Sequence, residues 1–165
     1  MLIDLVNKYY DKKYDLNCAE CMLVAANEKY ELNISKQTLM TMASFGGGMT
    51  VGSVCGAVTG AIAVLGIMFT TERGHQSPHV REMTNILVNE FNRRMEALDC
   101  ITLKEKYYKQ DGKRCILMMQ VATEVLEEII DKNKEIYNMV GKSSQEEIKY
   151  ENHFNKHKSR LRFVD

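Results

Sequence analysis

The chain has little of what marks a secreted, membrane-spanning or nucleic-acid-binding protein. Its 165 residues include no tryptophan and a single proline, and 22 basic side chains balance 22 acidic ones. A formal net charge of zero argues against nucleic acid or an acidic membrane as a partner. The first residues lack a basic start followed by a long apolar stretch, so we expect no signal peptide and a cytoplasmic location.

One apolar run has to be compared with a membrane helix. Residues 51–69 carry no charge, and Gly56 and Gly60 form the G-x-x-x-G pattern found in pairs of membrane helices. Further glycines dilute the run, however, and Cys55 would serve no purpose in lipid. We therefore expect a buried central helix that is apolar on all sides, and no membrane span.

Most of the remaining chain has apolar residues at helical spacing, and we find no convincing pair of strands. This pattern predicts an all-α fold, a compact multi-helix bundle around the glycine-rich apolar central helix. Eleven methionines suit such a core, because methionine fills irregular gaps. The predicted helices cover residues 3–14, 18–31, 36–45, 53–70, 78–98 and 114–130.

Several of these helices begin with capping signals. Asn17 and Glu20 have the spacing of a capping box, and Ser35 is expected to cap the following helix. Ser77 as a cap, with Pro78 at the first helical position, predicts another start. Residues 102–105 form a second sequence of the capping-box type, which leaves Cys100 in the loop before it.

The cysteines are the most informative residues of the chain. Their number, five, is odd, which together with the lack of a secretion signal argues against a scaffold of structural disulfides. Four of them are expected where a helix begins or where a turn meets a helix: Cys18, Cys55, Cys100 and Cys115.

These four thiols allow three interpretations. Four thiolates are the ligand count of an iron–sulfur cluster or of a structural zinc ion, although the spacing matches no common ferredoxin or zinc finger. Two pairs could instead cycle between dithiol and disulfide without a metal. In the third interpretation the cysteines are inert and buried, and the chain is a helical oligomerisation module. We favour the cluster slightly and consider zinc the weaker alternative.

Local features suit thiolate chemistry. Cys18 would sit in the first turn of a helix, where the helix dipole is expected to lower its pKa. Cys55 follows a glycine-rich loop whose backbone amides could hydrogen-bond a thiolate or a cluster sulfide. Glycines without side chains also allow a cofactor or a second helix to come close. The candidate cofactor-binding glycines are Gly46, Gly47, Gly48, Gly56 and Gly60.

Other motifs are weaker. No Gly-Lys-Ser/Thr follows the glycines, so we predict no nucleotide, and the absence of Cys-x-x-Cys-His argues against covalent haem. Cys21 completes a Cys-x-x-Cys, but no βαβ pattern surrounds it, and it is more simply a buried apolar residue. The histidines form two i, i+4 pairs that we do not predict to bind metal functionally: His75 with His79, and His153 with His157.

From about residue 14 to residue 130, the chain resembles a family of redox-active proteins named for the pattern C_GCAxxG_C_C. Cys18 after Asn17 is similar to the first cysteine of that pattern. Residues 45–49 and 55–60, which read FGGGM and CGAVTG, are similar to its centre. Cys100 and Cys115 are similar to its last two cysteines. Related domains occur in the split-Soret cytochrome group, which carries an iron–sulfur centre, so the resemblance implies electron transfer or cluster binding.

The sequence therefore predicts a small cytoplasmic redox protein. Residues 1–130 are expected to form the cysteine-containing helical domain. Residues 131–165 form a charged tail, partly helical or docked on a partner subunit. The redox partner protein is not identified by the sequence. A homo-oligomer is compatible with the glycine-lined central helix and the methionine-rich faces.

Overall fold

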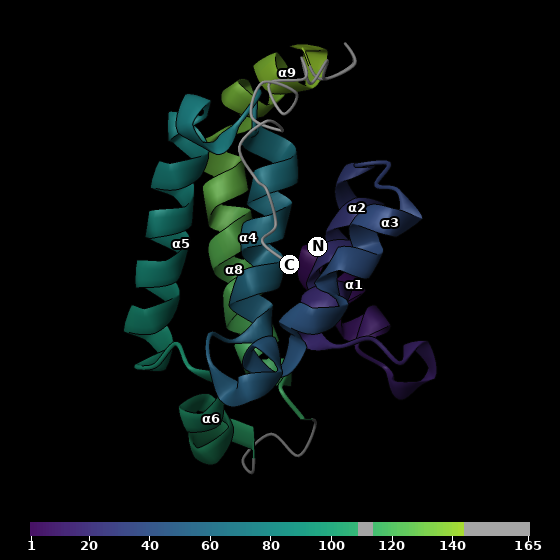
Figure 1. The fold of residues 1–165 in the computed structure, drawn as a ribbon, viewed down its shortest axis with the longest axis vertical. Helices are drawn as coiled ribbons and strands as arrows, with labels where there is room; N and C mark the ends of the chain where they lie inside the picture. Colours follow the sequence, from purple (N-terminus) through teal and green to yellow (C-terminus); the bar gives the residue numbers. More distant parts are fainter. Residues whose placement is uncertain (109–113, 144–165) are drawn as a thin grey trace, which may run out of the picture.

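The computed structural model describes residues 1–108 and 114–143, with side chains up to residue 140. Over these residues the chain is helical, and its only β-type pairing is an isolated bridge between Val54 and Asp99 (Figure 1). The all-α prediction is confirmed. The longer helices are α1 (Leu2–Tyr9), α2 (Cys18–Tyr30), α4 (Gly56–Phe69), α5 (Pro78–Met95), α8 (Ile116–Lys132) and α9 (Lys134–Ser143).

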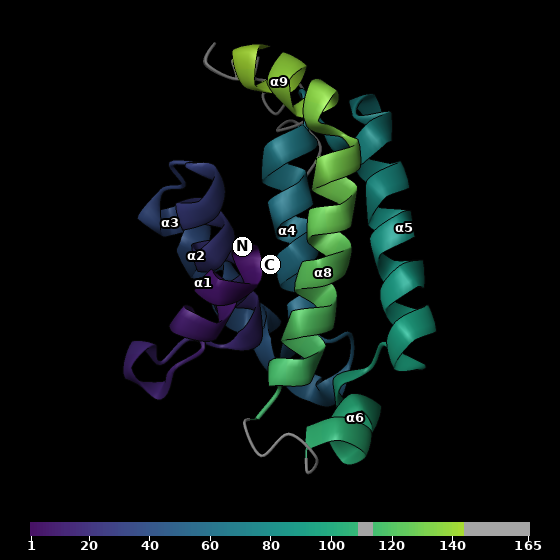
Figure 2. The same cartoon turned by 180° about the vertical axis from the view of Figure 1, so that it is seen from behind.

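Shorter helical segments connect these helices. They are η1 (Lys12–Tyr14), α3 (Lys36–Met40), η2 (Thr41–Phe45), η3 (Gly48–Gly52), η4 (Gly74–Gln76), α6 (Cys100–Leu103) and η5 (Lys104–Tyr108). Segments η3 and α6 lie together at one end of the bundle, and α9 lies at the other end (Figures 1 and 2).

Helix α4 is the centre of the bundle, as predicted. It packs against α2 on one side and against α5 and α8 on the other (Figures 1 and 2). Its residues are apolar around the whole circumference, so it is buried on several sides. A Cβ atom at Gly60 would lie 2.8 Å from the carbonyl oxygen of Ala19 and from the Cβ of Met22. The missing side chain therefore lets α2 approach α4 closely.

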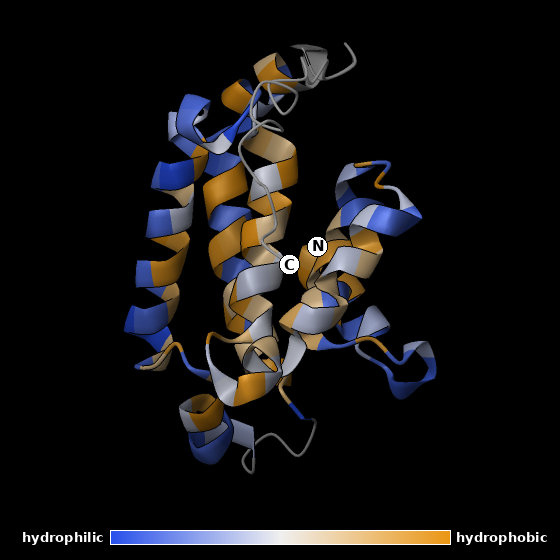
Figure 3. Cartoon of the chain, viewed as in Figure 1, coloured by the Kyte–Doolittle hydropathy of each residue, from blue (hydrophilic) through white to orange (hydrophobic). Residues whose placement is uncertain are grey.

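The outer helices are amphipathic. In α5, the apolar residues at helical spacing Met83, Leu87, Phe91 and Met95 are buried, while Val80 is half-buried. The opposite side of α5 is mostly polar (Figure 3). Burial of one face against α4 and α8 accounts for the position of this helix, since apolar area removed from water is the main driving force of packing.

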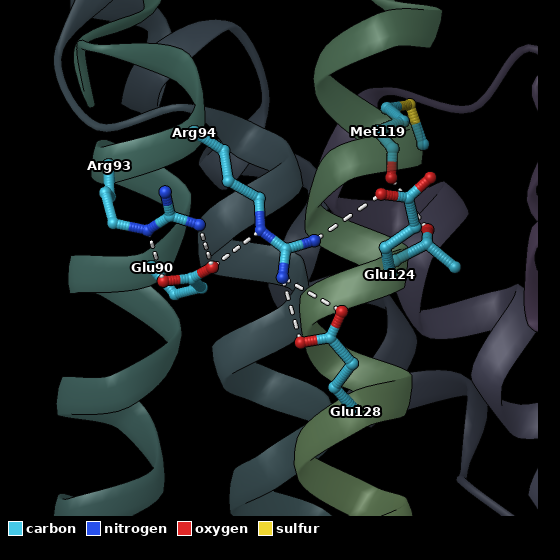
Figure 4. A network of polar contacts seen from close by, with 7 residues as sticks. Glu90, Arg93, Arg94, Met119, Glu124 and Glu128 are labelled. Carbon is cyan, nitrogen blue, oxygen red and sulfur yellow. Dashed lines mark hydrogen bonds and ion pairs between the residues drawn. The ribbon is translucent and has the colours of Figure 1, made fainter.

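A network of ion pairs also joins α5 to α8 (Figure 4). The Arg94 guanidinium lies 2.7 Å from a Glu90 carboxylate oxygen on its own helix and 2.9 Å from Glu128 on α8. Glu124 is 3.5 Å away. Arg93 donates two further hydrogen bonds to Glu90. These hydrogen bonds lower the pKa of Glu90 to about 2.

Two of the predicted helix caps are confirmed. The Asn17 side chain accepts from the backbone of Ala19 at 2.9 Å and of Glu20 at 3.0 Å, and Glu20 bonds back to the Asn17 backbone. Ser35 accepts from the Thr38 amide at 3.1 Å.

Two other caps differ from the prediction. The Ser77 hydroxyl does not cap α5, because it accepts the Thr71 amide hydrogen at 3.1 Å instead. The capping box expected at residues 102–105 is wrong. Helix α6 begins three residues earlier, with Asp99 as its cap and Cys100 as its first residue, because the Asp99 carboxylate accepts from the Thr102 amide at 2.8 Å. Cys100 therefore lies on a helix and not in a loop.

The sequence pattern predicted several helices to be longer than they are in the structure. The helix expected over 3–14 breaks after Tyr9, and that expected over 53–70 begins only at Gly56. Helix α5 ends at Met95, because Glu96 adopts a left-handed conformation with φ of 55°. Arg114, with φ of 64°, likewise precedes the start of α8.

Within the described ranges, every helix is too short or too polar to span a lipid bilayer. Helix α9, from the tail, packs on α4 and α8, with Tyr137 edge-on to Phe69 at 6.0 Å between ring centroids. The proposed boundary at residue 130 stays a prediction. The second histidine pair, His153 and His157, lies outside the described residues.

Candidate functional site

The four cysteines singled out by the sequence line one cavity of about 210 Å³ at the η3–α6 end of the bundle. A single water needs roughly 10–15 Å³, so the space is larger than one solvent molecule. Each of these cysteines stands at a helix start, which for Cys100 replaces the predicted loop position. Cys18 and Cys100 are the first residues of α2 and α6, while Cys55 and Cys115 immediately precede α4 and α8.

Backbone pairing holds two of the cysteines next to each other. The Cys55 amide donates to the Leu98 carbonyl at 2.8 Å, and the Cys100 amide donates to the Ser53 carbonyl at 2.6 Å. These two hydrogen bonds flank the bridge between Val54 and Asp99. Chain segments more than 40 residues apart are thereby fixed with their cysteines at the same cavity.

The glycine-rich segment leaves room for this arrangement. A Cβ atom at Gly48 would lie 2.5 Å from the Ser53 carbonyl oxygen and 2.7 Å from the Cys100 Cβ. Gly48 also has φ of 66°, a conformation that side chains rarely adopt. At Gly56, a Cβ would lie 3.1 Å from the Cys18 Cβ. The close approach at Gly48 thus requires glycine, and that at Gly56 leaves little room for a side chain.

The five candidate glycines are not equivalent. Gly47 and Gly56 line the cavity. Gly46 packs against the Asn17 side chain, Gly48 against Cys100, and Gly60 against α2. A cofactor-binding role for these glycines stays a prediction.

Cys18 and Cys115 form the most closely coupled pair of the site. A hydrogen bond with the Cys115 thiol raises the pKa of Cys18, and burial and the neighbouring thiols add to this effect. The expectation that the start of α2 lowers the pKa of Cys18 is therefore wrong. The helix dipole is outweighed by burial and by a second sulfur that shares its proton.

The other two thiols are also held in the protonated form. Burial raises the pKa of Cys55 to about 12, although the Ala57 and Val58 amides at the start of α4 partly oppose this shift. Burial raises the pKa of Cys100 as well, and the Lys104 ammonium partly opposes this shift. Removing the protons therefore requires a positive partner or oxidation of the sulfur.

No three histidine, cysteine or acidic side chains within residues 1–108 and 114–143 form a group that could hold one metal ion. All five cysteines are thiols and none is in a disulfide. The chemistry of the cavity is nevertheless that of a sulfur-donor site, because four thiols from four separate elements share one space.

Cys21 is separate from this site. Its side chain is fully buried between α2 and α1, and its sulfur lies 3.5 Å from the Val6 carbonyl oxygen. Burial raises its pKa to about 12. His75 and His79 are exposed near the start of α5 and do not line the cavity. The interpretation of Cys21 as a buried apolar residue agrees with its position.

Three polar residues that line the cavity were not predicted from the sequence: Tyr10, Lys104 and Tyr108. The Cys115 amide donates to the Tyr10 hydroxyl at 3.0 Å, and that hydroxyl lies 3.9 Å from the Cys18 sulfur. Burial raises the pKa of Tyr10, so its phenol keeps its proton. Nothing in the local sequence marks Tyr10, because its partners lie up to 105 positions away.

The comparison with protein families matches residues 16–129 to the family described as "Putative redox-active protein (C_GCAxxG_C_C)". This match covers more than half of the chain and includes all four cavity cysteines. The chain belongs to this family. No match was found among curated proteins or among solved structures.

Proposed function

We propose that this member of the redox-active family is an electron-transfer protein in which Cys18, Cys55, Cys100 and Cys115 hold an iron–sulfur cluster. The supporting observation is the single cavity that all four side chains line. Four cysteine thiolates are the common ligand set of [2Fe–2S] and [4Fe–4S] clusters. When bound, a cluster of this kind takes up and releases single electrons.

The four cysteines do not converge on one point among the described residues, which supports a cluster over a single ion, although Cys18 and Cys115 are hydrogen-bonded to each other. A zinc ion binds sulfur at about 2.3 Å, so its four sulfurs must lie within about 4.6 Å of one another. The described residues contain no such group of three or more ligands. A [4Fe–4S] cluster offers a separate iron to each cysteine, and its ligands can therefore stay further apart around a larger cavity.

The charges around the cavity support the same proposal. Four thiolates bring four negative charges, which are costly to bury without compensation. Lys104 and Arg114 line the cavity and bring two positive charges to it. The Ala57 and Val58 amides at the start of α4 favour the charged form of the Cys55 thiol. These groups would offset the negative charge of a thiolate-bound centre.

A second candidate function is dithiol–disulfide exchange at Cys18 and Cys115, which the hydrogen bond between their thiols favours. Oxidation would join the two sulfurs, release two protons and pass two electrons to a disulfide of a partner protein. The partner's disulfide would then become two thiols. Protonated thiols react slowly, so this exchange would first require loss of the proton from one sulfur.

The decisive experiment is purification without oxygen, followed by the visible absorption spectrum and the iron, zinc and acid-labile sulfide content. We expect a brown protein with iron and sulfide in equal amounts. Zinc without iron would contradict the cluster and indicate a structural site. A metal-free protein whose thiols oxidise reversibly in pairs would favour the dithiol function. A metal-free protein without reversible oxidation would contradict both.

Two cysteine variants make this test specific. Cys55→Ser is expected to abolish the absorption of the centre and leave the helical circular dichroism largely intact. Cys21→Ala is the matched control, because Cys21 is buried on the same bundle but does not line the cavity. It is expected to keep the full iron content. Loss of iron in Cys21→Ala but not in Cys55→Ser would contradict the assignment.

A further inference from the structure

The hydroxyl group of Tyr10 lies between two of the cavity cysteines. It accepts a hydrogen bond from the Cys115 amide at 3.0 Å, and its oxygen is 3.9 Å from the Cys18 sulfur. The side chain is only 8% exposed. Tyr10 stands at the end of α1, so it is the contribution of the first helix to a site that otherwise consists of later elements.

The direction of these hydrogen bonds follows from the donors present. A backbone amide can only donate, so the Tyr10 oxygen accepts from Cys115. The single hydrogen of the phenol is then available for the Cys18 sulfur. A sulfur that binds a metal has no hydrogen of its own, and in that state only Tyr10 can be the donor of this contact.

Arg114 holds the tyrosine in this orientation. Its guanidinium lies 4.2 Å from the centroid of the Tyr10 ring and donates a hydrogen bond to the Tyr10 carbonyl oxygen. The Tyr10 amide donates to the Val6 carbonyl at 2.9 Å. The ring is thus held by the contact of Arg114 with its face and by the hydrogen bonds of the Tyr10 backbone. Its hydroxyl therefore does not need to reorient when the charge on the sulfur changes.

We propose that Tyr10 is a positioning residue that donates a hydrogen bond to the Cys18 sulfur and raises the reduction potential of the cysteine centre. Reduction places more negative charge on the cysteine sulfurs, and hydrogen bonds to charged acceptors are stronger than those to neutral ones. Hydrogen bonds to sulfur are among the factors that set the potentials of such centres. The inference rests on the proposed function.

The test is the midpoint potential of the anaerobically purified protein and of its Tyr10→Phe variant. Phenylalanine keeps the ring under Arg114 and removes only the hydroxyl. We expect the reduction equilibrium to become about tenfold less favourable, which lowers the midpoint of the one-electron centre by about 59 mV. An unchanged midpoint in Tyr10→Phe would overturn the role of Tyr10.

Tyr9→Phe is the matched control. The Tyr9 hydroxyl bonds to Glu28 at the surface and does not line the cavity. Its removal is expected to leave the midpoint unchanged. A shift of the same size in Tyr9→Phe would show that any loss of a tyrosine hydroxyl on α1 disturbs the centre, and it would overturn the specific role of Tyr10.

A second replacement guards against a Tyr10→Phe variant that fails to fold. Site-specific 3-fluorotyrosine at position 10 keeps the hydroxyl and makes it a stronger donor, so the midpoint should move upward. A loss of packing would not produce this opposite shift. A midpoint that stays constant or falls would overturn the proposal.

The proposed function and the role of Tyr10 can be distinguished by their failures. If the wild-type protein shows no reversible couple that depends on its cavity cysteines, the proposed function and the role of Tyr10 are both overturned. If the wild type shows such a couple and neither replacement at position 10 moves its midpoint as expected, only the role of Tyr10 is overturned.

Discussion

The middle of the helical bundle and its cysteine end are held in place by different interactions. In the middle, regular helices α2, α4, α5 and α8 bury apolar side chains against one another. None of these four helices contains a residue with positive φ. At the cysteine end, Gly47, Gly48, Met49 and Thr50 are consecutive left-handed residues, and four cysteines line one cavity.

The difference indicates that the unfavourable terms in the stability of the molecule are concentrated at the cysteine end, where the candidate site lies. A non-glycine residue in the left-handed conformation costs roughly 1–2 kcal/mol, and both Met49 and Thr50 adopt it. Burial also raises the pKa of Cys55 and Cys100. The apolar middle compensates for these unfavourable terms. Local strain of this kind is often found at functional sites, and here it lies beside the cavity that the sequence motif marks.

Gly48→Ala is expected to lower the free energy of unfolding more than any other variant considered. The change lies at the cysteine end of the bundle. The new methyl group would meet the Ser53 backbone and the Cys100 Cβ, and the left-handed conformation adds about 1–2 kcal/mol. Gly47→Ala is the matched control, since Gly47 is also left-handed but has open space around its Cβ. Urea unfolding of the metal-free variants should show the greater loss for Gly48→Ala. Equal losses would mean that the contact with Ser53 and Cys100 does not matter.

Gly60→Ala tests the middle of the bundle. Its methyl group would lie 2.8 Å from the Ala19 carbonyl oxygen on α2, so we expect a loss of about 1–3 kcal/mol in the free energy of unfolding. Gly66, on the same helix, has nothing within 4 Å of its Cβ position. Gly66→Ala should therefore gain about 0.5–1 kcal/mol, the usual difference between alanine and glycine in a helix. Thermal or urea unfolding of both variants checks the pair, and a stabilising Gly60→Ala would contradict the close packing of α2 on α4.

Much of the middle could be predicted from local sequence, because its structure depends on local rules. The apolar spacing of Met83, Leu87 and Phe91 gave the buried face of α5, and the Asn17 capping box gave the start of α2. Two caps were mispredicted because a competing partner lay nearby. Ser77 bonds to Thr71 and not to its own helix, and Asp99 takes the amide of Thr102.

The cysteine end was predictable in its residues but not in its arrangement. The four cavity cysteines could be identified in the sequence from their positions near expected helix starts and from the glycines around Cys55. That Cys55 and Cys100 are joined through the backbone of residues 53 and 98 depends on long-range pairing. Tyr10 carries no local signal, because it is informative only once α1 and α8 are packed together. The expected low pKa of Cys18 failed because helix position was considered without burial.

The smallest expected effect concerns the ion pairs at the surface of the middle region. Hydrogen bonds from Arg93 and Arg94 hold the pKa of Glu90 at about 2, below the usual value of about 4.3 for glutamate. Because the pKa is lowered on folding, the stabilisation from Glu90 is present above about pH 4.3 and is lost as the pH falls towards 2. The free energy of unfolding of Glu90→Gln should therefore lie slightly below that of the wild type at pH 7, and the two should converge near pH 2. Since Glu90 is solvent-accessible, 1 M salt should reduce the difference at pH 7. A difference that persists in salt and at low pH would mean that the Glu90 side chain stabilises the α5–α8 contact by packing and not by charge.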